Sequence, residues 1–112
     1  MSPVADRPTP LTYQILLALA DAPRHGYGVI KEIELRDGEG AAPSTGALYL
    51  ALQRMEGEEL IAETEGPPDE DARRRYYRLT SRGRSVAEAE SKRLVALVAA
   101  ARSKELLPGS TR

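Results

Sequence analysis

Residues 73–84 read Arg-Arg-Arg-Tyr-Tyr-Arg-Leu-Thr-Ser-Arg-Gly-Arg, and this stretch indicates both the fold and the class of function. It holds six arginines in twelve residues, although the formal net charge of the 112-residue chain is only −1. The preceding residues, 56–71, hold eight carboxylates and no basic side chain. Charge is therefore segregated along the chain, and a local cationic edge attracts a polyanion even when the average charge is near zero. The pattern points to nucleic acid as the partner.

The arginine-rich stretch is typical of the second strand of a β-hairpin. Residues 60–65 predict a first strand, and residues 66–71, which are rich in proline and acids, predict the hairpin tip. Residues 74–79 then predict the returning strand. Thr80 has the chemistry of an N-cap for a helix that follows directly.

Side chains alternate between the two faces of a strand, so the returning strand has an inner and an outer face. We expect Leu79 to face the core and to take Tyr77 with it. Tyr76 and Arg78 are then expected to face outward, beside the arginines at the hairpin tip.

Three shorter helices are predicted before the hairpin. The first runs from Pro10 to about Asp21, with Thr9 as its N-cap and Pro23 as its stop. It turns one apolar face inward by helical spacing: Leu11, Ile15, Ala18 and Leu19.

The second and third helices follow the same logic. His25-Gly26-Tyr27-Gly28 opens the second helix, which is expected to bury Tyr27, Ile30, Ile33 and Leu35. Residues 36–43 form a loop by their Gly, Asp and Pro content. Ser44 caps the third helix, which is expected to bury Leu48, Leu52 and Met55 and to expose Thr45, Tyr49, Gln53 and Arg54.

The last helix is predicted to run from Ser81 to Leu107, where Pro108-Gly109 ends it. Such a helix spans roughly 40 Å at 1.5 Å per residue, more than the rest of a small domain can cover. Its apolar stripe would stay in water unless a second chain buried it. We therefore expect a homodimer with this interface: Leu94, Leu97, Val98 and Ala101.

Composition excludes several other classes of protein. Without cysteine there is no disulfide framework, thiolate nucleophile or Cys-based zinc site. No apolar run approaches the roughly 20 residues of a membrane span, and the N-terminus lacks signal-peptide features. One histidine and no nucleophile–base motif argue against an enzyme, a metal site or a cofactor. A cytoplasmic binding protein is expected.

The predicted order of three helices, a basic hairpin and a long helix is that of a winged helix-turn-helix with a dimerisation helix. The fold class is mainly α with a small β-hairpin. The expected divisions are a disordered tail at 1–8, the winged-helix domain at 9–80, the dimerisation helix at 81–107 and a second disordered tail at 108–112.

Several segments together resemble the PadR family of bacterial transcriptional regulators. They are Leu16-Leu17-Ala18-Leu19, His25-Gly26-Tyr27, Gly46-Ala47-Leu48-Tyr49, Leu52, Arg54-Met55-Glu56, residues 73–80 and Gly83-Arg84. Each motif alone is weak, but the ordered set is specific. The chain departs from the family pattern at Ala47, Leu50 and Glu59, and at Glu59 either a positive φ or a different helix end is needed.

The resemblance implies a homodimeric repressor that binds a palindromic operator in double-stranded DNA and is released by a small hydrophobic or aromatic effector. In some members the effector lies near the dimer interface, between the first and last helices. Here that place corresponds to Tyr13, Leu94 and Leu97.

The candidate DNA contacts come from the third helix and the hairpin, or wing. They are Ser44, Thr45, Tyr49, Gln53, Arg54, Arg73, Arg74, Arg75 and Tyr76, with His25 and Tyr27 as further phosphate contacts.

Several of these DNA contacts have a structural alternative. The arginines could instead pair across the hairpin with Glu63 or Glu65, Tyr49 could be a half-buried core residue, and His25 could be a structural hydrogen-bond partner.

The sequence also allows a second function. A winged-helix module can serve protein–protein interaction after losing DNA binding, and the acidic tip, residues 69–71, motivates this alternative because carboxylates repel phosphates.

Overall fold

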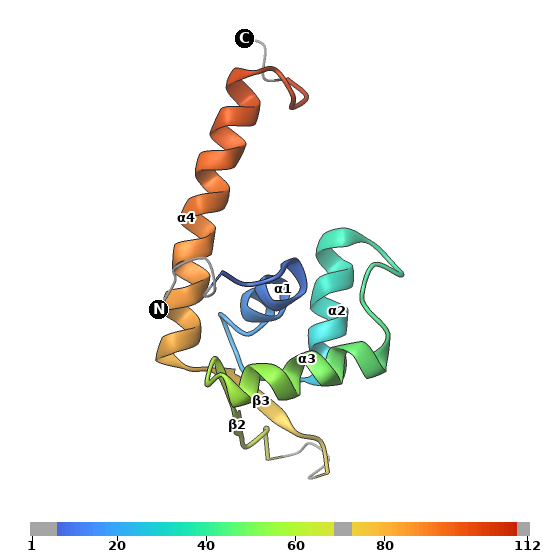
Figure 1. Cartoon of the computed structure of the whole chain (residues 1–112). Coiled ribbons are helices and arrows are strands. Elements are labelled where there is room, and N and C mark those ends of the chain that lie inside the picture. Colours follow the sequence, from blue (N-terminus) through green and yellow to red (C-terminus); the bar gives the residue numbers. More distant parts are fainter. Residues whose placement is uncertain (1–6, 69–72, 110–112) are drawn as a thin grey trace.

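The computed structural model describes residues 7–68 and 73–109 and confirms a mainly helical fold with a small sheet (Figure 1). The helices are α1 (Pro10–Ala18), α2 (Gly26–Asp37), α3 (Thr45–Gly57) and α4 (Ser81–Ser103). The antiparallel sheet has the order β1-β3-β2, formed by Arg24–His25, Tyr76–Leu79 and Ile61–Thr64. Most of both predicted tails and the acidic tip at 69–71 lie outside the described residues.

The predicted N-caps are confirmed. Each cap side-chain oxygen accepts a hydrogen bond from the backbone N–H three residues later, which satisfies a donor that has no partner within the helix. The pairs are Thr9 with Thr12 at 3.1 Å, Ser44 with Ala47 at 3.2 Å, and Thr80 with Gly83 at 2.9 Å.

Helix α3 ends at a residue with left-handed backbone. Glu59 adopts a φ of 63°, and the N–H of Leu60 donates to the carbonyl of Met55 at 3.0 Å. The N–H of Glu59 also donates to the carbonyl of Glu56 at 3.0 Å, and the two bonds together form a Schellman ending. Of the two alternatives at Glu59, the structure has the positive φ.

Helix α4 ends in the same way, and earlier than predicted. Glu105 has a φ of 63°, and the N–H of Leu106 donates to the carbonyl of Ala101 at 2.9 Å. The predicted end at Leu107 is therefore wrong. The left-handed turn closes the helix at Ser103, before Pro108-Gly109 is reached.

Helix α1 also ends early, at Ala18 rather than near Asp21. Nε of Arg24 donates to the carbonyl oxygen of Ala18 at 2.8 Å, and Nη2 of Arg24 lies 3.3 Å from Asp21. The arginine thus satisfies a carbonyl at the helix end, and Asp21 belongs to the turn. Arg24 and His25 then pair with Tyr77 and Tyr76 as strand β1, which the sequence interpretation missed.

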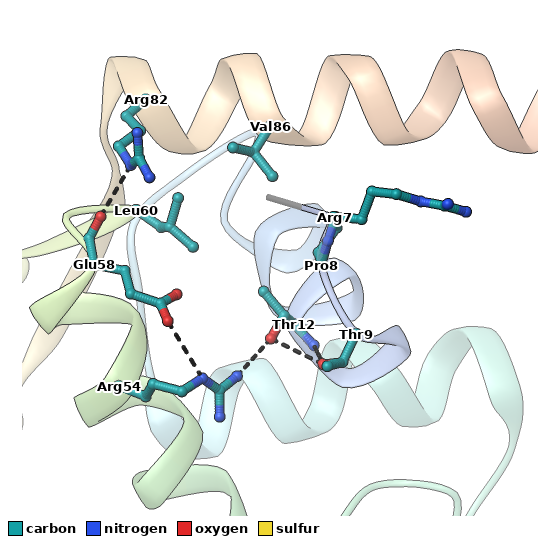
Figure 2. Close-up of a pocket in the computed structure, with 9 residues that line it drawn as sticks. All are labelled: Arg7, Pro8, Thr9, Thr12, Arg54, Glu58, Leu60, Arg82 and Val86. Carbon is teal, nitrogen blue, oxygen red and sulfur yellow. Dashed lines mark hydrogen bonds and ion pairs between the residues drawn. The ribbon is translucent and has the colours of Figure 1, made fainter. Parts of the chain in front are cut away.

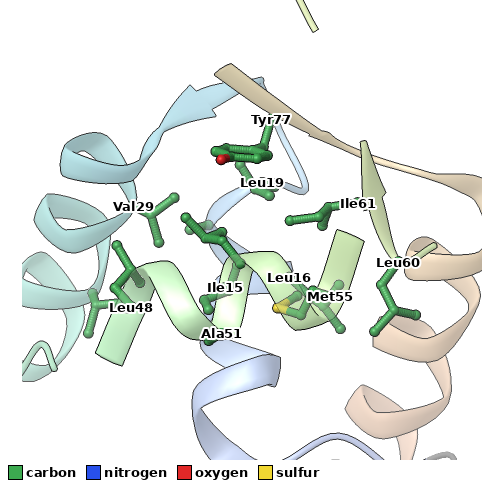
Figure 3. Packing of buried hydrophobic residues seen from close by; sticks show 13 residues of the cluster. Ile15, Leu16, Leu19, Val29, Leu48, Ala51, Met55, Leu60, Ile61 and Tyr77 are labelled. Atoms are coloured by element: carbon green, nitrogen blue, oxygen red, sulfur yellow. The ribbon is translucent and has the colours of Figure 1, made fainter. Parts of the chain in front are cut away.

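The core lies between the three short helices and one face of the sheet (Figure 3). Helix α3 crosses its centre, and its predicted inner residues Leu48, Leu52 and Met55 are buried. Ile15 and Leu16 of α1 lie opposite, and Tyr77 covers the sheet side.

The predicted inner face of α2 is partly wrong. Tyr27 is 54% exposed and Leu35 is 80% exposed, whereas Val29 and Ile33 are buried and Ile30 packs against the core. Residues 29 and 33 are one helical turn apart and share the inner face, which turns 27 and 35 outward.

The predicted outward orientation of Tyr76 is also wrong, because its side chain is only 7% exposed. Its ring lies edge-on to His25 at a centroid distance of 5.1 Å. Gly66 lies against the same ring, since a Cβ on Gly66 would be 2.4 Å from it. Strand β1 and the start of the wing therefore cover the face that alternation alone assigns to solvent.

Helix α4 begins against the winged-helix body and then projects beyond it (Figure 1). Val86 and Ala87 in its first turns pack against the core. Farther along, Val95, Leu97 and Val98 are 68%, 52% and 45% exposed. The predicted unpartnered apolar surface is present in the single chain.

Candidate nucleic-acid interface

The outer face of α3 carries the predicted groove contacts. Because its inner residues are fixed in the core, the helix turns Thr45, Tyr49 and Gln53 to solvent. A solvent-facing helix that begins at a capped N-terminus can reach base edges in a DNA major groove.

Tyr49 combines the two interpretations proposed for it. Its side chain is 44% exposed, and its phenol end lies against Gly26 at the start of α2. A Cβ on Gly26 would lie 2.4 Å from the Tyr49 hydroxyl, so only glycine permits this approach. The ring is thus held in place by α2 while part of it faces outward.

Arg54 lies apart from the other predicted contacts of α3. Its Nη2 donates to Oγ1 of Thr12 at 2.6 Å, and its Nε lies 3.9 Å from a carboxylate oxygen of Glu58 (Figure 2). It lines a pocket of about 370 Å³ between the start of α1, the end of α3 and the start of α4. The structure therefore gives Arg54 a bridging position between α3 and α1.

The wing arginines meet the helical elements in a second cavity. A concave groove of about 320 Å³ is lined by His25, Tyr27, Tyr49 and Arg73 to Arg75. The chain positions of these residues differ widely, but the pairing of β1 with β3 brings the wing beside the start of α2. Six of the eleven sequence-predicted DNA or phosphate contacts thus line one basic groove.

His25 has a definite structural role at this groove. Its Nδ1 accepts a hydrogen bond from the N–H of Gly28 at 3.0 Å and so caps α2. Its Nε2 lies 2.8 Å from Nη1 of Arg74. The His25 side chain therefore caps α2 and also contacts the wing at the rim of the groove.

Arg75 takes the cross-strand alternative. Its Nε lies 3.7 Å from a carboxylate oxygen of Glu63 in β2. The pKa of Arg75 is raised, first by its interaction with the Tyr77 side chain and then by the Glu63 carboxylate. The pKa of Tyr77 is raised, chiefly by burial. The Glu63 carboxylate offsets part of the charge of Arg75, so this arginine attracts a phosphate less strongly than its sequence position suggests.

A sequence model of the transcriptional regulator PadR-like family matches residues 15–89, which include α2, α3, the wing and the start of α4. The chain belongs to the PadR family. The resemblance found in the sequence and the winged-helix fold are thereby confirmed.

Solved structures of transcriptional regulators share this architecture. A PadR family transcription regulator from Clostridium difficile R20291 is 26% identical, with 83% of this chain and 95% of that chain covered and a TM-score of 0.69. A transcriptional regulator from Clostridium thermocellum is 25% identical, with 83% and 87% covered and a TM-score of 0.69. Bacillus subtilis PadR bound to operator DNA is 20% identical, with 70% and 45% covered and a TM-score of 0.60, and shows the shared fold.

Two curated relatives match part of the PadR-family region. An uncharacterised 37.1 kDa protein of transposon Tn4556 from Streptomyces fradiae is 40% identical over 77 residues, which are 69% of this chain and 21% of the relative. Uncharacterised protein X of Lysinibacillus sphaericus is 32% identical over 71 residues, which are 63% of this chain and 65% of the relative. The chain therefore spans less than two thirds of either relative.

In this PadR-family chain the predicted effector residues lie where α1 meets α4. The hydroxyl of Tyr13 and Oγ of Ser91 share a hydrogen bond of 2.7 Å. Leu94 is half-buried and Leu97 is exposed. The pocket of Figure 2 lies nearer the start of α4, around Arg82 and Val86.

An acid is buried near the same junction. Glu90 of α4 is only 6% exposed and accepts hydrogen bonds from the guanidinium of Arg93. The pKa of Glu90 is lowered, chiefly by these hydrogen bonds, while burial acts in the opposite direction.

Within residues 7–68 and 73–109, no helix is long and apolar enough to cross a membrane.

Proposed function

We propose that this PadR-family regulator is a homodimeric repressor that binds a palindromic operator through α3 and the wing. The observation that supports this most directly is the basic groove formed by β1, α2, α3 and the arginines just before β3. In the proposed complex Thr45, Tyr49 and Gln53 face base edges, and Gln53 is suited to adenine. The cap of α3 at Ser44 leaves its first-turn N–H groups directed at a phosphate.

The wing supplies affinity in this proposal. Arg73 and Arg74 contact the DNA backbone, and His25, whose Nε2 lies 2.8 Å from Nη1 of Arg74, is a phosphate contact beside them. Arg75 contributes less, because Glu63 lies 3.7 Å from its guanidinium. Tyr27, exposed beside His25, is a further phosphate donor. Tyr76 supports the wing from beneath through its buried ring.

Two chains pair through the outer half of α4 in the proposed dimer. Leu97 and Val98 are half-exposed, and Leu94 and Ala101 lie on the same side of the helix. A second copy would remove this apolar stripe from water, and the paired chains would present two copies of α3 to two half-sites.

Effector release acts at the junction of α1 and α4. Tyr13 bonds to Ser91 there, one helical turn from Leu94, and a partner helix on Leu97 would close this region from solvent. A small hydrophobic ligand that alters the packing of α4 against α1 changes the spacing of the two α3 helices. Operator affinity then falls, because half-site spacing must match the dimer.

The proposal is tested by fluorescence anisotropy with a duplex selected from a random library, titrated across salt concentrations. The double variant Arg73→Ala/Arg74→Ala is expected to lose affinity. The slope of log K against log salt should also become shallower by about 0.9 for each phosphate that the variant no longer neutralises. The matched control is Lys92→Ala/Arg102→Ala, which removes the same charge from exposed positions of α4.

Two outcomes would contradict DNA binding by the groove. One is the absence of any retained duplex at low salt. The other is equal loss of affinity in both double variants, which would indicate a general charge effect. A stoichiometric protein partner without DNA retention would favour the interaction-module alternative.

A further inference from the structure

We propose that Leu50, together with Gly46, reads the 5-methyl group of a thymine in the major groove. This inference rests on the proposed DNA binding and adds a determinant of base sequence to it. Leu50 and Gly46 lie one turn apart on the outer face of α3, and the fold itself explains neither residue type.

Leu50 is an exposed apolar side chain on the helix that is proposed to meet DNA. It is 68% exposed, whereas Leu48, Ala51, Leu52 and Met55 of the same helix are buried. Single exposed leucines are common on protein surfaces, so exposure alone decides nothing. The position of Leu50 is more informative, because two proposed DNA contacts are its neighbours: the exposed Tyr49 precedes it, and Gln53 follows it by one turn.

Gly46 supplies the second, independent observation. Its φ is not positive, and a Cβ added to it would meet no atom within 4 Å, so neither backbone geometry nor packing within the described chain requires glycine. Glycine is nevertheless among the poorest helix formers. A side-chain-free turn allows an external surface to approach the helix backbone closely, and this approach would press the neighbouring Leu50 against that surface.

The positive charge beside this face favours a polyanion as the external surface. Tyr49, adjacent to Leu50, lines the groove that also holds Arg73 to Arg75. An apolar protein partner would find this cationic rim unfavourable to bury, whereas duplex DNA supplies phosphates at the rim and base edges between them. The occupant of the Gly46–Leu50 face is therefore the floor of a major groove.

Within a major groove, one group suits an exposed leucine. The thymine 5-methyl is the apolar feature of the base edges, and cytosine presents a hydrogen atom at that position. Contact with Leu50 removes both apolar groups from water. One methyl group is worth about fourfold in affinity when it is buried in this way.

The experiment replaces thymine by deoxyuridine, one position at a time, in the duplex selected by the wild-type chain. This substitution removes the methyl group and leaves the hydrogen-bonding edge unchanged. We expect a thymine in each half-site whose replacement weakens wild-type binding about fourfold. In Leu50→Ala the same replacement should have no effect. Leu35→Ala, which truncates a leucine that is 80% exposed on α2, should retain the wild-type sensitivity.

A second pair of variants tests Gly46. Gly46→Ala should bind the selected duplex more weakly although its thermal stability rises, because the added methyl separates the helix from the groove. Gly57→Ala is the matched control, since Gly57 is in the same helix, also has no positive φ and also meets no atom within 4 Å. It should leave the affinity unchanged.

The outcomes separate the two proposals. Tight binding that no deoxyuridine weakens, or sensitivity that persists in Leu50→Ala, overturns thymine reading and leaves DNA binding intact. Affinity for no duplex at all overturns both. Equal effects of Gly46→Ala and Gly57→Ala overturn the role of Gly46.

Discussion

Arg74 of the wing and His25 at the start of α2 meet across the basic groove, with Nη1 of Arg74 2.8 Å from Nε2 of His25. The other ring nitrogen, Nδ1, accepts a hydrogen bond from the N–H of Gly28 and caps α2. One side chain thus caps a helix and contacts a wing arginine.

Two substitutions at His25 separate these roles. His25→Asn keeps a good N-cap and loses the ring nitrogen that contacts Arg74, so we expect nearly wild-type stability with weaker DNA binding. His25→Ala loses both, and the free energy of unfolding should fall by about 0.5–2 kcal/mol. Urea denaturation and anisotropy measure the two effects. Equal affinity of wild type and His25→Asn would remove His25 from the DNA interface.

Glu59 offers a stabilising substitution. A left-handed backbone costs a residue with a Cβ about 1–2 kcal/mol, and glycine avoids this cost but loses more entropy on folding. With a φ of 63° at Glu59, Glu59→Gly should raise the free energy of unfolding by about 1 kcal/mol in urea denaturation. The neighbouring Glu58 has a φ of −86°, so Glu58→Gly should be destabilising. If Glu59→Gly and Glu58→Gly changed the free energy of unfolding in the same direction, this explanation would be refuted.

The apolar stripe of α4 predicts the oligomeric state. Leu97→Gln/Val98→Gln should weaken the dimer about a hundredfold or more, because both chains lose two buried side chains at the interface. These residues are 52% and 45% exposed in the single chain, so helicity by circular dichroism should not change. Sedimentation velocity measures the dimer. Ala96→Gln, on the opposite side of the same turn, is the control, and a wild-type monomer would contradict the prediction.

Glu90 predicts a loss of stability in acid. Its pKa is lowered in the folded protein, so the folded state favours the carboxylate, and the resulting stability is complete above the unfolded pKa of about 4.3. That stability is lost as the pH falls through the lowered folded pKa. Wild type should therefore lose stability more steeply than Glu90→Gln below about pH 4.3.

Denaturation at a series of pH values and a fixed protein concentration tests this dependence on Glu90. Glu88→Gln, at an exposed position of the same helix, should follow the wild-type profile. If the free energy of unfolding fell in parallel with pH for wild type and Glu90→Gln, the carboxylate of Glu90 would contribute nothing to the loss of stability in acid.

Local chemistry explains what could be predicted from the residues. The caps at Thr9, Ser44 and Thr80 depend on side chains that bond to backbone within three residues, so a short window of sequence contains the whole interaction. The inner face of α3 follows from helical spacing alone. The motifs were also enough to predict the family, because their order along the chain can be read directly from the sequence.

The faces of the wing needed tertiary contacts. The alternation of side chains along a strand assigns Tyr76 to solvent. In the structure, however, its ring is covered by β1, which is about fifty residues earlier in the chain, and by Gly66, on the other side of the hairpin turn. Strand β1 itself exists only because Arg24 and His25 find β3, and two residues carry no strand signal of their own.

The sequence by itself thus determined the order of elements, their N-caps, the apolar stripe of α4 and the arginine-rich wing, all of which depend on near neighbours. Only the tertiary structure decided that Arg54 turns to Thr12, that Arg75 pairs with Glu63, and that Arg74 meets His25 across the groove. Periodicity places a side chain on a face, but the partner that occupies that face is brought there by long-range packing.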